Sequence, residues 1–240
     1  MEMTMYIAAA AVYVPALVMF YYILKDYTYP KVENPFFEDS KVFTLFAVGL
    51  IEGFFISWAY VNFFDKSNIF IGAIFALIQV LALLVVLNLR RFHGKSDTVF
   101  YGFSLGIGQG VGVAFGMAVF LLSIAFLTDD VDIPTIVMTA TFIAQELLIS
   151  SSVGATVGEG VARLRLTEYT SKAAVFSVIC MILWTFVFIL DPASYLWIIP
   201  MIGMLAVSAY YFYDVVHVRL STVVADILKS NGIVRNDLPR

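Results

Sequence analysis

The chain is poor in cysteine and histidine, and this removes several kinds of site from consideration. Cys180 is the one cysteine, so neither an internal disulfide nor a cysteine-rich metal site can form. It lies in an apolar stretch, where we expect a small buried side chain. His93 and His217 are the two histidines, and no His-x-x-x-His or Glu-x-x-His pair is present, which excludes a three-histidine metal site. No metal and no cofactor are therefore expected.

Charged residues are also scarce. They make up 13% of the 240 residues, against roughly a quarter in soluble domains, whereas hydrophobic residues reach 61% and the mean hydropathy is +0.92. The net charge of −4 offers no basic stripe for nucleic acid, so nucleic acid is not an expected partner. The composition leaves no room for a sizeable soluble domain. It predicts a multi-pass protein of the cell membrane, with the lipid bilayer as its solvent.

What charge there is follows a regular pattern. Of the fourteen Lys and Arg residues, all but Lys66 fall in every second gap between the apolar stretches. Cationic loops are retained on the cytoplasmic side of a membrane, so the pattern predicts seven spans with the N-terminus outside and the C-terminus inside. The cations in the alternate gaps are Lys25, Lys31, Lys41, Arg90, Arg91, Lys95, Arg163, Arg165, Lys172, Arg219, Lys229, Arg235 and Arg240.

The spans are predicted to be helices, because the apolar runs are long and continuous. A membrane barrel needs strands of about ten residues that alternate apolar and polar positions. An open sheet would leave backbone groups without hydrogen bonds in lipid. No lysine lies in the last span, which excludes a retinal Schiff base there. The expected spans are residues 4–24, 42–64, 68–89, 98–127, 133–164, 169–190 and 195–216.

Residues 1–216 are thus expected to form one transmembrane domain, followed by a cytoplasmic tail at 217–240. Apolar residues from Val216 to Leu228 recur at helical spacing among polar ones, which predicts an amphipathic helix on the membrane surface or against the cytoplasmic loops. Pro134 follows the acidic segment 129–132 where the fifth span begins, as expected of a helix N-terminus. Pro15 and Pro200 lie inside spans, where each is predicted to kink its helix.

Small residues recur at every fourth position in the fourth and fifth spans. Helices in membranes associate by close backbone approach, which such residues permit, so these two spans are predicted to cross tightly and form the core. A functional alternative is that the backbone at these glycines, which carry no side chains, lines a cavity or lets a substrate helix approach. The residues are Gly102, Gly106 and Gly110, then Gly108, Gly112 and Gly116, in the fourth span and Ser150, Gly154, Gly158 and Ala162 in the fifth.

Polar side chains within the hydrocarbon are the candidate site. Glu52 lies near the middle of the second span and Glu146 in the fifth, with Gln109, Gln145 and Ser150 as candidate binding residues beside them. Burying a charge at mid-membrane costs about 2.5–3.5 kcal/mol on insertion scales, so such groups need a reason to be there. In one shared pocket, Glu52 and Glu146 could activate water, carry protons or hold a cation. Alternatively, both are protonated and form hydrogen bonds between packed helices.

Two other acidic residues have neighbours of their own. Glu159 lies four residues before Arg163, which predicts a simple ion pair near the inner interface. Asp214 and His217 are expected at the same interface.

The glycine-rich spans resemble those of the PrsW-type intramembrane proteases. The stretch from Asp97 to Gly116, with Tyr101-Gly102 followed by Gly106-Ile107-Gly108, is similar to the family's helix in which tyrosine-glycine precedes a Gly-Leu-Gly run. The fifth span, in which Gly154-Ala-Thr-Val-Gly158 follows a polar residue two turns earlier, resembles the family's later histidine helix. The resemblance covers about half of the chain.

Proteases of this family, related to the CAAX-processing group, use a Glu-Glu pair, a further Glu and a His to activate water. The resemblance maps the paired glutamates onto Ile51-Glu52, which keeps one of the two. It maps the further glutamate onto apolar residues near Val113, and the histidine onto Gln145 or Glu146. What the resemblance implies is a retained fold with most of the catalytic set missing, hence an inactive relative or a changed chemistry.

Three functions stay open at this point. The first is a PrsW-like protein, catalytic or degenerate, that binds a transmembrane segment or peptide beside the second, fourth and fifth spans. The second is a proton- or cation-coupled transporter or channel with Glu52 and Glu146 as ion sites, although no internal repeat of the kind common in transporters is present. The third is a non-catalytic subunit that holds a partner membrane protein through its glycine faces and tail helix.

Overall fold

The computed structural model consists of helices joined by turns and loops. It describes residues 2–127, 133–190, 195–233, 235 and 237, and within these ranges it contains no strand. Seven of the helices are long and apolar enough to cross a membrane. The prediction of an all-α protein with seven apolar helices is therefore confirmed.

The helices follow the predicted spans closely, and their ends differ from the prediction by a few residues. After α7 the chain passes through a π-helical turn, η3, and continues into α8. The elements are α1 (Glu2–Leu24), α2 (Asp39–Phe63), α3 (Ile69–Leu87), η1 (Arg90–Phe92), α4 (Thr98–Leu127), α5 (Ile133–Ala162), α6 (Leu166–Ile189), α7 (Ile198–Phe212), η3 (Tyr213–Val218) and α8 (Leu220–Ser230).

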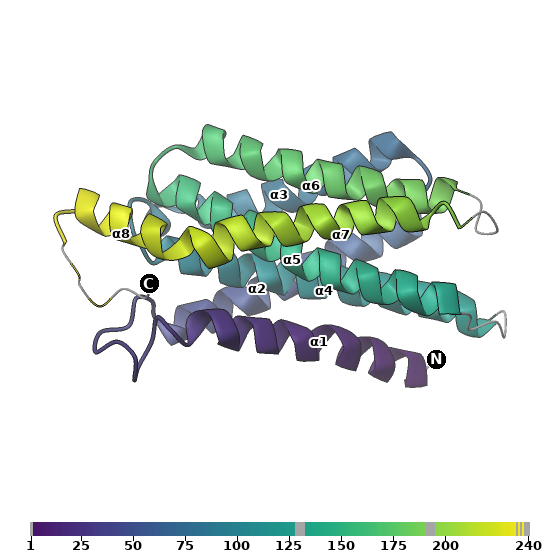
Figure 1. Ribbon diagram of the computed structural model, residues 1–240, viewed down its shortest axis with the longest axis horizontal. Coiled ribbons are helices and arrows are strands. Elements are labelled where there is room, and N and C mark those ends of the chain that lie inside the picture. Colours follow the sequence, from purple (N-terminus) through teal and green to yellow (C-terminus); the bar gives the residue numbers. More distant parts are fainter. Residues whose placement is uncertain (1, 128–132, 191–194, 234, 236, 238–240) are drawn as a thin grey trace.

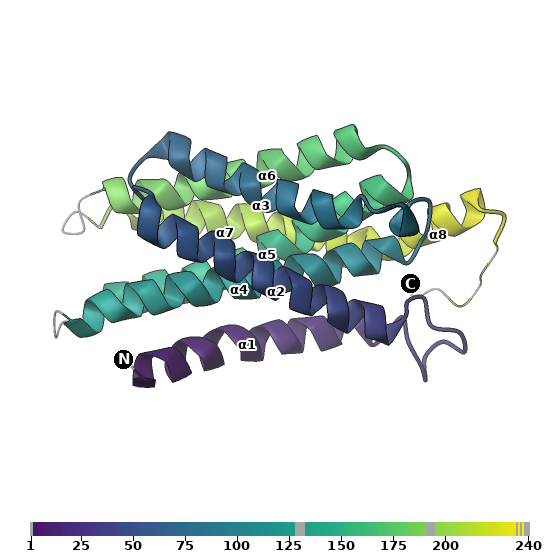
Figure 2. The same ribbon diagram turned by 180° about the vertical axis from the view of Figure 1, so that it is seen from behind.

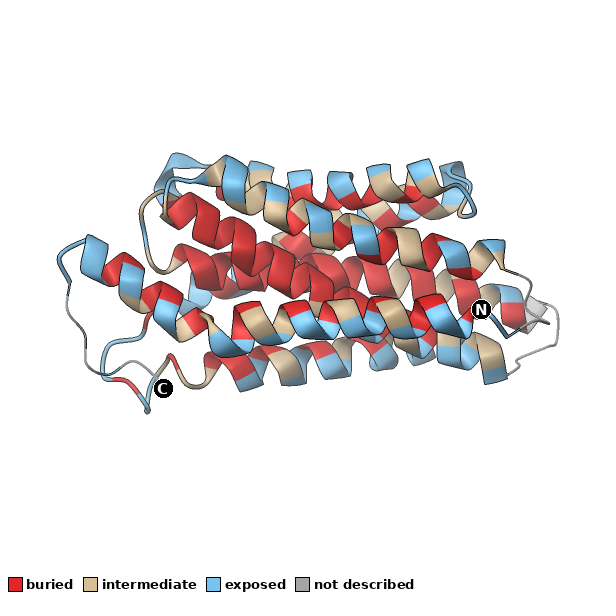
Figure 3. Ribbon diagram, turned by 45° about the horizontal axis from the view of Figure 1, so that its top comes forward, coloured by how far each residue is buried: buried red, intermediate tan, exposed pale blue. Residues whose placement is uncertain are grey.

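The long helices lie side by side, and α4 and α5 occupy the middle of the bundle (Figure 1). Figure 3 shows these two as the most continuously buried helices, with the others around them. The outer helices turn large apolar side chains outward, for example Phe43, Ile74, Val175 and Ile202. An outward apolar surface is what a bilayer accepts, because lipid tails are themselves apolar.

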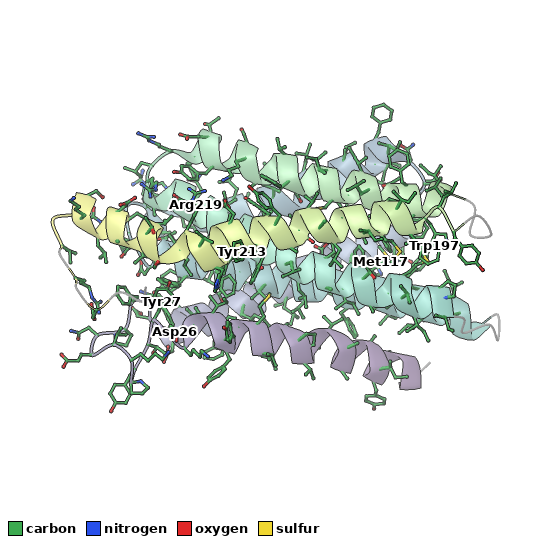
Figure 4. All side chains as sticks on the ribbon, in the orientation of Figure 1. Asp26, Tyr27, Met117, Trp197, Tyr213 and Arg219 are labelled. Carbon is green, nitrogen blue, oxygen red and sulfur yellow. The ribbon has the colours of Figure 1, made fainter. Side chains whose placement is uncertain are left out.

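The loops after α1, α3 and α5 meet α8 at one end of the bundle, and the chain begins at the other end (Figures 1 and 2). Asp26, Tyr27 and Arg219 lie towards the first end, whereas Met117 and Trp197 lie towards the second (Figure 4). The alternate gaps that carry most of the cations thus share one end. Which side of a membrane this end faces stays a prediction from the charge pattern.

The loop between α1 and α2 folds back onto α4 through aromatic contacts. The Tyr27 ring lies 4.8 Å from that of Phe100, and the Phe37 ring lies 5.2 Å from it, between centroids. Burial, followed by the nearby charge of Asp26, raises the pKa of the Tyr27 phenol to about 12. The aromatic contacts thus place this loop over the start of α4, at the end of the bundle that carries most of the cations.

Local signals explain several helix ends. Asn68 caps α3, because its side-chain oxygen accepts hydrogen bonds from the backbone N–H groups of Phe70, at 3.0 Å, and Ile71. Pro134 lies in the first turn of α5, as predicted, while the acidic segment 129–132 lies outside the described residues. The last span was predicted to begin near residue 195, and α7 begins a few residues later. Because α7 begins at Ile198, Pro200 falls in a first turn, where its missing N–H leaves no helical hydrogen bond unmade.

The end of the chain forms the short helix α8. Five apolar side chains of α8 are buried, while Lys229 and Ser230 at its end are exposed. The predicted domain boundary at residues 216 and 217 falls inside the π turn that precedes it. The buried side chains are Leu220, Val223, Val224, Ile227 and Leu228.

Candidate functional site

One face of α4 lies directly against α5. A Cβ atom added at Gly102 would collide with the carbonyl oxygen of Gly154, and one added at Gly106 would collide with that of Ser150. The contact is mutual, since a Cβ atom at Gly158 would lie 2.6 Å from the carbonyl oxygen of Thr98. Only glycine permits this approach, so these residues bring the two backbones together.

The opposite face of α4 lies equally close to α2. Cβ atoms at Gly108 and Gly112 would collide with carbonyl oxygens of α2, and those at Gly49 and Gly53 would collide with carbonyl oxygens of α4. The sequence analysis did not use Gly49 and Gly53, although they are spaced by four residues and flank Glu52. Both glycine faces of α4 are thus covered by helices of this chain. The arrangement is that of close helix packing, and it leaves no room for a substrate helix at Gly102, Gly106, Gly108 or Gly112.

Glu146 lies on α5 and is 1% exposed. Its carboxyl oxygen accepts a hydrogen bond of 2.8 Å from the Ser150 hydroxyl, one turn along the helix. The acid and the hydroxyl share one side of α5, because residues four apart lie one above the other on a helix. Gly110 of α4 lies beside both, because a Cβ atom there would be 3.0 Å from the Glu146 carbonyl oxygen and from the Ser150 Cβ.

Gln109 of α4 is fully buried, and its side-chain amide donates a hydrogen bond of 3.1 Å to the carbonyl oxygen of Gln79 on α3. The Gln109 side-chain oxygen and the Gln79 side-chain nitrogen have no hydrogen-bond partner among the described residues. Sequence analysis did not single out Gln79. A signal for it existed, because it is the one polar side chain within the helix α3.

Glu52 lies on α2, next to Gly53, and is half-buried. One of its carboxyl oxygens is fully buried without a hydrogen-bond partner in the described part of the chain. A Cβ atom at Gly53 would collide with the Gln109 carbonyl oxygen, which places Glu52 at the level of Gln109.

Five of these residues form one layer across the bundle, which we call the central polar layer. Three contacts at the same level of the bundle connect it. Gly53 of α2 lies against the Gln109 backbone, and Gln109 donates a hydrogen bond to α3. Gly110, the next residue of α4, lies against α5. Its members are Glu52, Gln79, Gln109, Glu146 and Ser150.

Among the described residues, the central polar layer lines none of four cavities of the bundle. The helices that carry Glu52 and Glu146 pack against opposite faces of α4, with Gln109 at the same level between them. Two carboxyl groups activate one water only when both reach it, and the packing of α4 between their helices stands against that. The catalytic assignment of Glu52 and Glu146 stays a prediction.

Gln145 is separated from the central polar layer, although it precedes Glu146 in the chain. Successive residues of a helix point about 100° apart, and Gln145 lies on the side of α5 away from α4. It is fully buried, and neither atom of its side-chain amide has a partner in the described ranges.

Charged residues form a second cluster at the end of α5, which we call the ionic cluster. Glu159 is 4% exposed, and its carboxylate lies 2.8 Å from Arg163 and 3.9 Å from Arg219. The predicted Glu159–Arg163 ion pair is confirmed. Arg219 also lies 3.6 Å from Asp214, and Arg163 lies 3.3 Å from Asp226. The cluster therefore joins α5 to the π turn and to α8.

The two histidines lie apart from both clusters. His93 contacts Asn88 through its Nε2 atom at 3.1 Å, and the His217 ring packs against Tyr213 at 5.3 Å between centroids. Within the described residues, no group of three His, Cys, Asp or Glu side chains is arranged to hold a metal ion. Cys180 is buried, as predicted, and its thiol lies 3.9 Å from the carbonyl oxygen of Met204.

The tyrosine-glycine pair of the resemblance also has a structural environment. The Tyr101 hydroxyl accepts a hydrogen bond of 3.2 Å from the backbone N–H of Glu38, which ties α4 to the loop before α2. Asp97, just before α4, is half-buried, and this burial raises the pKa of its carboxyl group above the usual value. The hydrogen bond between Tyr101 and Glu38 anchors the start of α4 to this loop.

Comparison of the chain with protein family models, with characterised proteins and with solved structures gives no match. The similarity to PrsW-type proteases therefore stays a resemblance of two helices. Function has to be inferred from the geometry.

Proposed function

We propose that this chain is a non-catalytic integral membrane protein that binds a transmembrane segment of a partner protein. The bundle core is closed by glycine contacts on both faces of α4, and its buried carboxyl groups are carried by helices on opposite sides of α4. This arrangement fits a rigid scaffold better than an enzyme. In the terms of the resemblance, it would be a PrsW-like fold that keeps helix binding and loses proteolysis.

The observation that carries the proposal is a groove between the first part of α1 and the later parts of α2 and α4. Its volume is about 430 Å³, and aromatic side chains such as Phe54 and Trp58 form its walls. Small or polar residues, namely Gly116, Ser123 and Asn62, also line it. Figure 2 shows α1 running beneath α4 and α2 on this side.

The lining of the groove favours a helix over lipid as the occupant. Lipid tails offer no hydrogen bonds and gain nothing from a surface of small residues, whereas transmembrane helices associate through small residues and polar side chains. Asn62 is exposed near the end of α2, where its side-chain amide donates a hydrogen bond of 2.8 Å to the Trp58 carbonyl oxygen. The oxygen of such an amide can accept a further hydrogen bond. A partner helix carrying small and hydrogen-bonding residues matches this surface.

Photocrosslinking from inside the groove tests the proposal. A benzoylphenylalanine in place of Trp58, which is 50% exposed, is expected to crosslink to an apolar segment of about 20 residues in one partner protein. The matched control places the same group at Val85 of α3, a position 72% exposed outside the groove. If the crosslinks from the two positions are the same, or consist of lipid alone, the groove is not a helix-binding site.

The same experiment separates binding from proteolysis. A non-catalytic binder leaves the crosslinked partner at full length, and Glu146→Gln leaves that length unchanged. A protease would yield a cleaved partner with the unaltered chain and an intact one with Glu146→Gln. Recovery of the cleaved form would overturn the non-catalytic part of the proposal.

A second candidate is conduction of protons or cations through the bundle. The unpartnered amide atoms of Gln79 and Gln109 beside two buried carboxyl groups favour it, because membrane interiors seldom leave polar groups unmatched. Ion flux into proteoliposomes that falls in Glu52→Gln and Glu146→Gln would support conduction. Flux that ignores both substitutions would exclude those carboxyl groups as ion sites.

A further inference from the structure

The face of α5 turned away from α4 carries a line of buried polar side chains. They are spaced by seven, four and three residues, which places them on one side of the helix. None belongs to the central polar layer. The four residues are Gln145, Ser152, Thr156 and Glu159, and they are 0%, 0%, 1% and 4% exposed.

This face of α5 lies against α7. The Thr156 hydroxyl forms a hydrogen bond of 2.6 Å with the Tyr211 hydroxyl of α7. Nearer the other end, Thr141 shares a cavity of about 490 Å³ with Met201 and Leu205 of α7. Gln145 lies one turn after Thr141 and about three turns before Thr156. Because α7 lies close to α5 at both of these residues, Gln145 falls within the stretch of α5 that runs along α7. We call this contact the α5–α7 seam.

On α7, two residues near these contacts, Met204 and Ser208, are also buried. Met204 and Ser208 are 0% exposed and precede Tyr211 by seven and three residues, which places them on the same side of the helix. Ser208 and Ser152 both donate to carbonyl oxygens of their own helices, at 3.0 and 2.7 Å. Their hydroxyl oxygens stay available as acceptors in the seam.

Gln145 is the residue that this seam leaves unsatisfied. Its amide has two donors and one acceptor oxygen, and neither the nitrogen nor the oxygen has a partner among the described residues. Lipid offers no hydrogen bonds, and the backbone groups of a helix are already paired. Buried water is the usual partner of such a group, typically through about three hydrogen bonds.

The seam ends at the ionic cluster, where water has access. The side chain of Arg219 is 37% exposed and lies 3.9 Å from Glu159. Gln145 and Glu159 are fourteen residues apart (159 − 145), which corresponds to about 21 Å along the helix axis. Beyond Gln145, α5 and α7 line the cavity that contains Thr141 and Met201. The polar line therefore runs from the ionic cluster to Gln145.

We propose that the α5–α7 seam is an inlet for water, which enters at the ionic cluster and reaches Gln145 along Thr156 and Ser152. Its occupant is a file of water molecules held by hydroxyl and amide groups. The inlet would bring water and protons into the bundle from the end that carries the ionic cluster. It does not depend on the function proposed above.

Water labelling of the unaltered chain tests the inlet without any substitution. Hydroxyl radicals generated from ¹⁸O-labelled water oxidise side chains next to ordered water. Met204, which faces the seam, and Met117, which lies on α4, are both 0% exposed and form a matched pair. The inlet predicts that Met204 gains ¹⁸O and Met117 gains little. Equal labelling of the two would overturn the proposal.

Isosteric cysteine variants then locate the water. Ser151 and Ser152 are both 0% exposed and bond to the same carbonyl oxygen, that of Leu148, but they point about 100° apart. Ser151→Cys and Ser152→Cys are compared in the full-length Cys180→Ala protein by the infrared S–H band after transfer to heavy water. Ser152→Cys is expected to exchange at least about tenfold faster, because Ser151→Cys would exchange only through local opening.

The endpoint at Gln145 is tested in the same assay. Gln145→Cys, in the same Cys180→Ala protein, places a thiol at the end of the proposed path, so its S–H band is expected to exchange about as fast as that of Ser152→Cys. If exchange at Ser152→Cys is no faster than at Ser151→Cys, the seam is dry and the inlet is excluded. If Gln145→Cys exchanges as slowly as Ser151→Cys, the water does not extend to Gln145, and the proposed path is wrong.

Discussion

The side of α5 that faces α4 and the side that faces α7 are both buried, but they differ in composition. Glycines line the first side, and polar side chains line the second. Towards α4, Gly154 and Gly158 bring two backbones into direct contact, and Glu146 is satisfied by Ser150. Towards α7, the side-chain amide of Gln145 has no partner in the part of the chain that the structure describes. Burial alone therefore does not distinguish a packing surface from a polar path. The difference lies in whether each buried polar group is matched.

The largest loss of stability is expected for a substitution on the side of α5 that faces α4. In Gly154→Ala the added Cβ would collide with the Gly102 carbonyl oxygen, so the backbones must separate, at a cost of about 2–4 kcal/mol. Gly203→Ala is the control, because its Cβ would lie 3.5 Å from the Leu183 side chain, an ordinary contact. Unfolding in detergent, followed by circular dichroism, measures both. Equal stabilities would show that the α4–α5 contact is not tight.

A smaller loss of stability is expected for a substitution at Glu159, where the α5–α7 seam meets the ionic cluster. Glu159→Gln removes the carboxylate shared by Arg163 and Arg219, while each arginine keeps an acidic neighbour, so the expected cost is about 1–2 kcal/mol. Glu168→Gln should cost about 0–0.5 kcal/mol, since Glu168 and Arg165 are both well exposed at 3.8 Å. The same unfolding assay, at low and high salt, compares the two. A result in which Glu168→Gln costs more would contradict the central role of Glu159.

Neighbouring serines give a finer comparison. Ser150→Ala removes the hydroxyl that donates to the Glu146 carboxyl group, with an expected loss of about 1 kcal/mol. Ser151→Ala removes a hydroxyl that only donates to a carbonyl oxygen of its own helix, so the expected change is within about 0.5 kcal/mol. Thermal melting of both variants tests this order, and the reverse order would mean that Glu146 has another partner.

The smallest change in stability is expected at Asp97, which lies just before α4 and belongs to neither side of α5. Burial raises the pKa of its carboxyl group in the folded chain, so the folded state binds the proton more tightly than the unfolded state. Asp97 therefore lowers stability as pH rises from the unfolded pKa, about 3.9, through the folded value. Because the group is partly exposed, Asp97→Asn should recover only about 0.5 kcal/mol at neutral pH. Melting temperatures across this pH range, with and without the substitution, provide the measurement.

The helices were predictable from sequence because span length and apolar composition are local properties. The Glu159–Arg163 and Glu146–Ser150 pairs were predictable too, since residues four apart share one side of a helix. The separation of Gln145 from Glu146 follows from the same helical geometry, but it gains meaning only once α4 and α7 are placed on either side.

Other parts of the site needed the folded chain. Gln79 reaches Gln109 from α3, and Arg219 reaches Glu159 through the π turn after α7. The second glycine face of α4 met α2, which the sequence analysis had not paired with it. Each of these contacts joins residues that are distant in the chain, so no spacing rule could connect them.

By itself the sequence determined seven apolar helices and which gaps between them share an end, because each span must satisfy its backbone and cover itself with apolar side chains. The tertiary structure decided which faces meet. In a bilayer, the side of a helix that faces lipid and the side that faces the core are both apolar, so apolar periodicity does not tell inside from outside. Glycine contacts and unmatched polar groups make that distinction here, and they become visible only when the helices are packed.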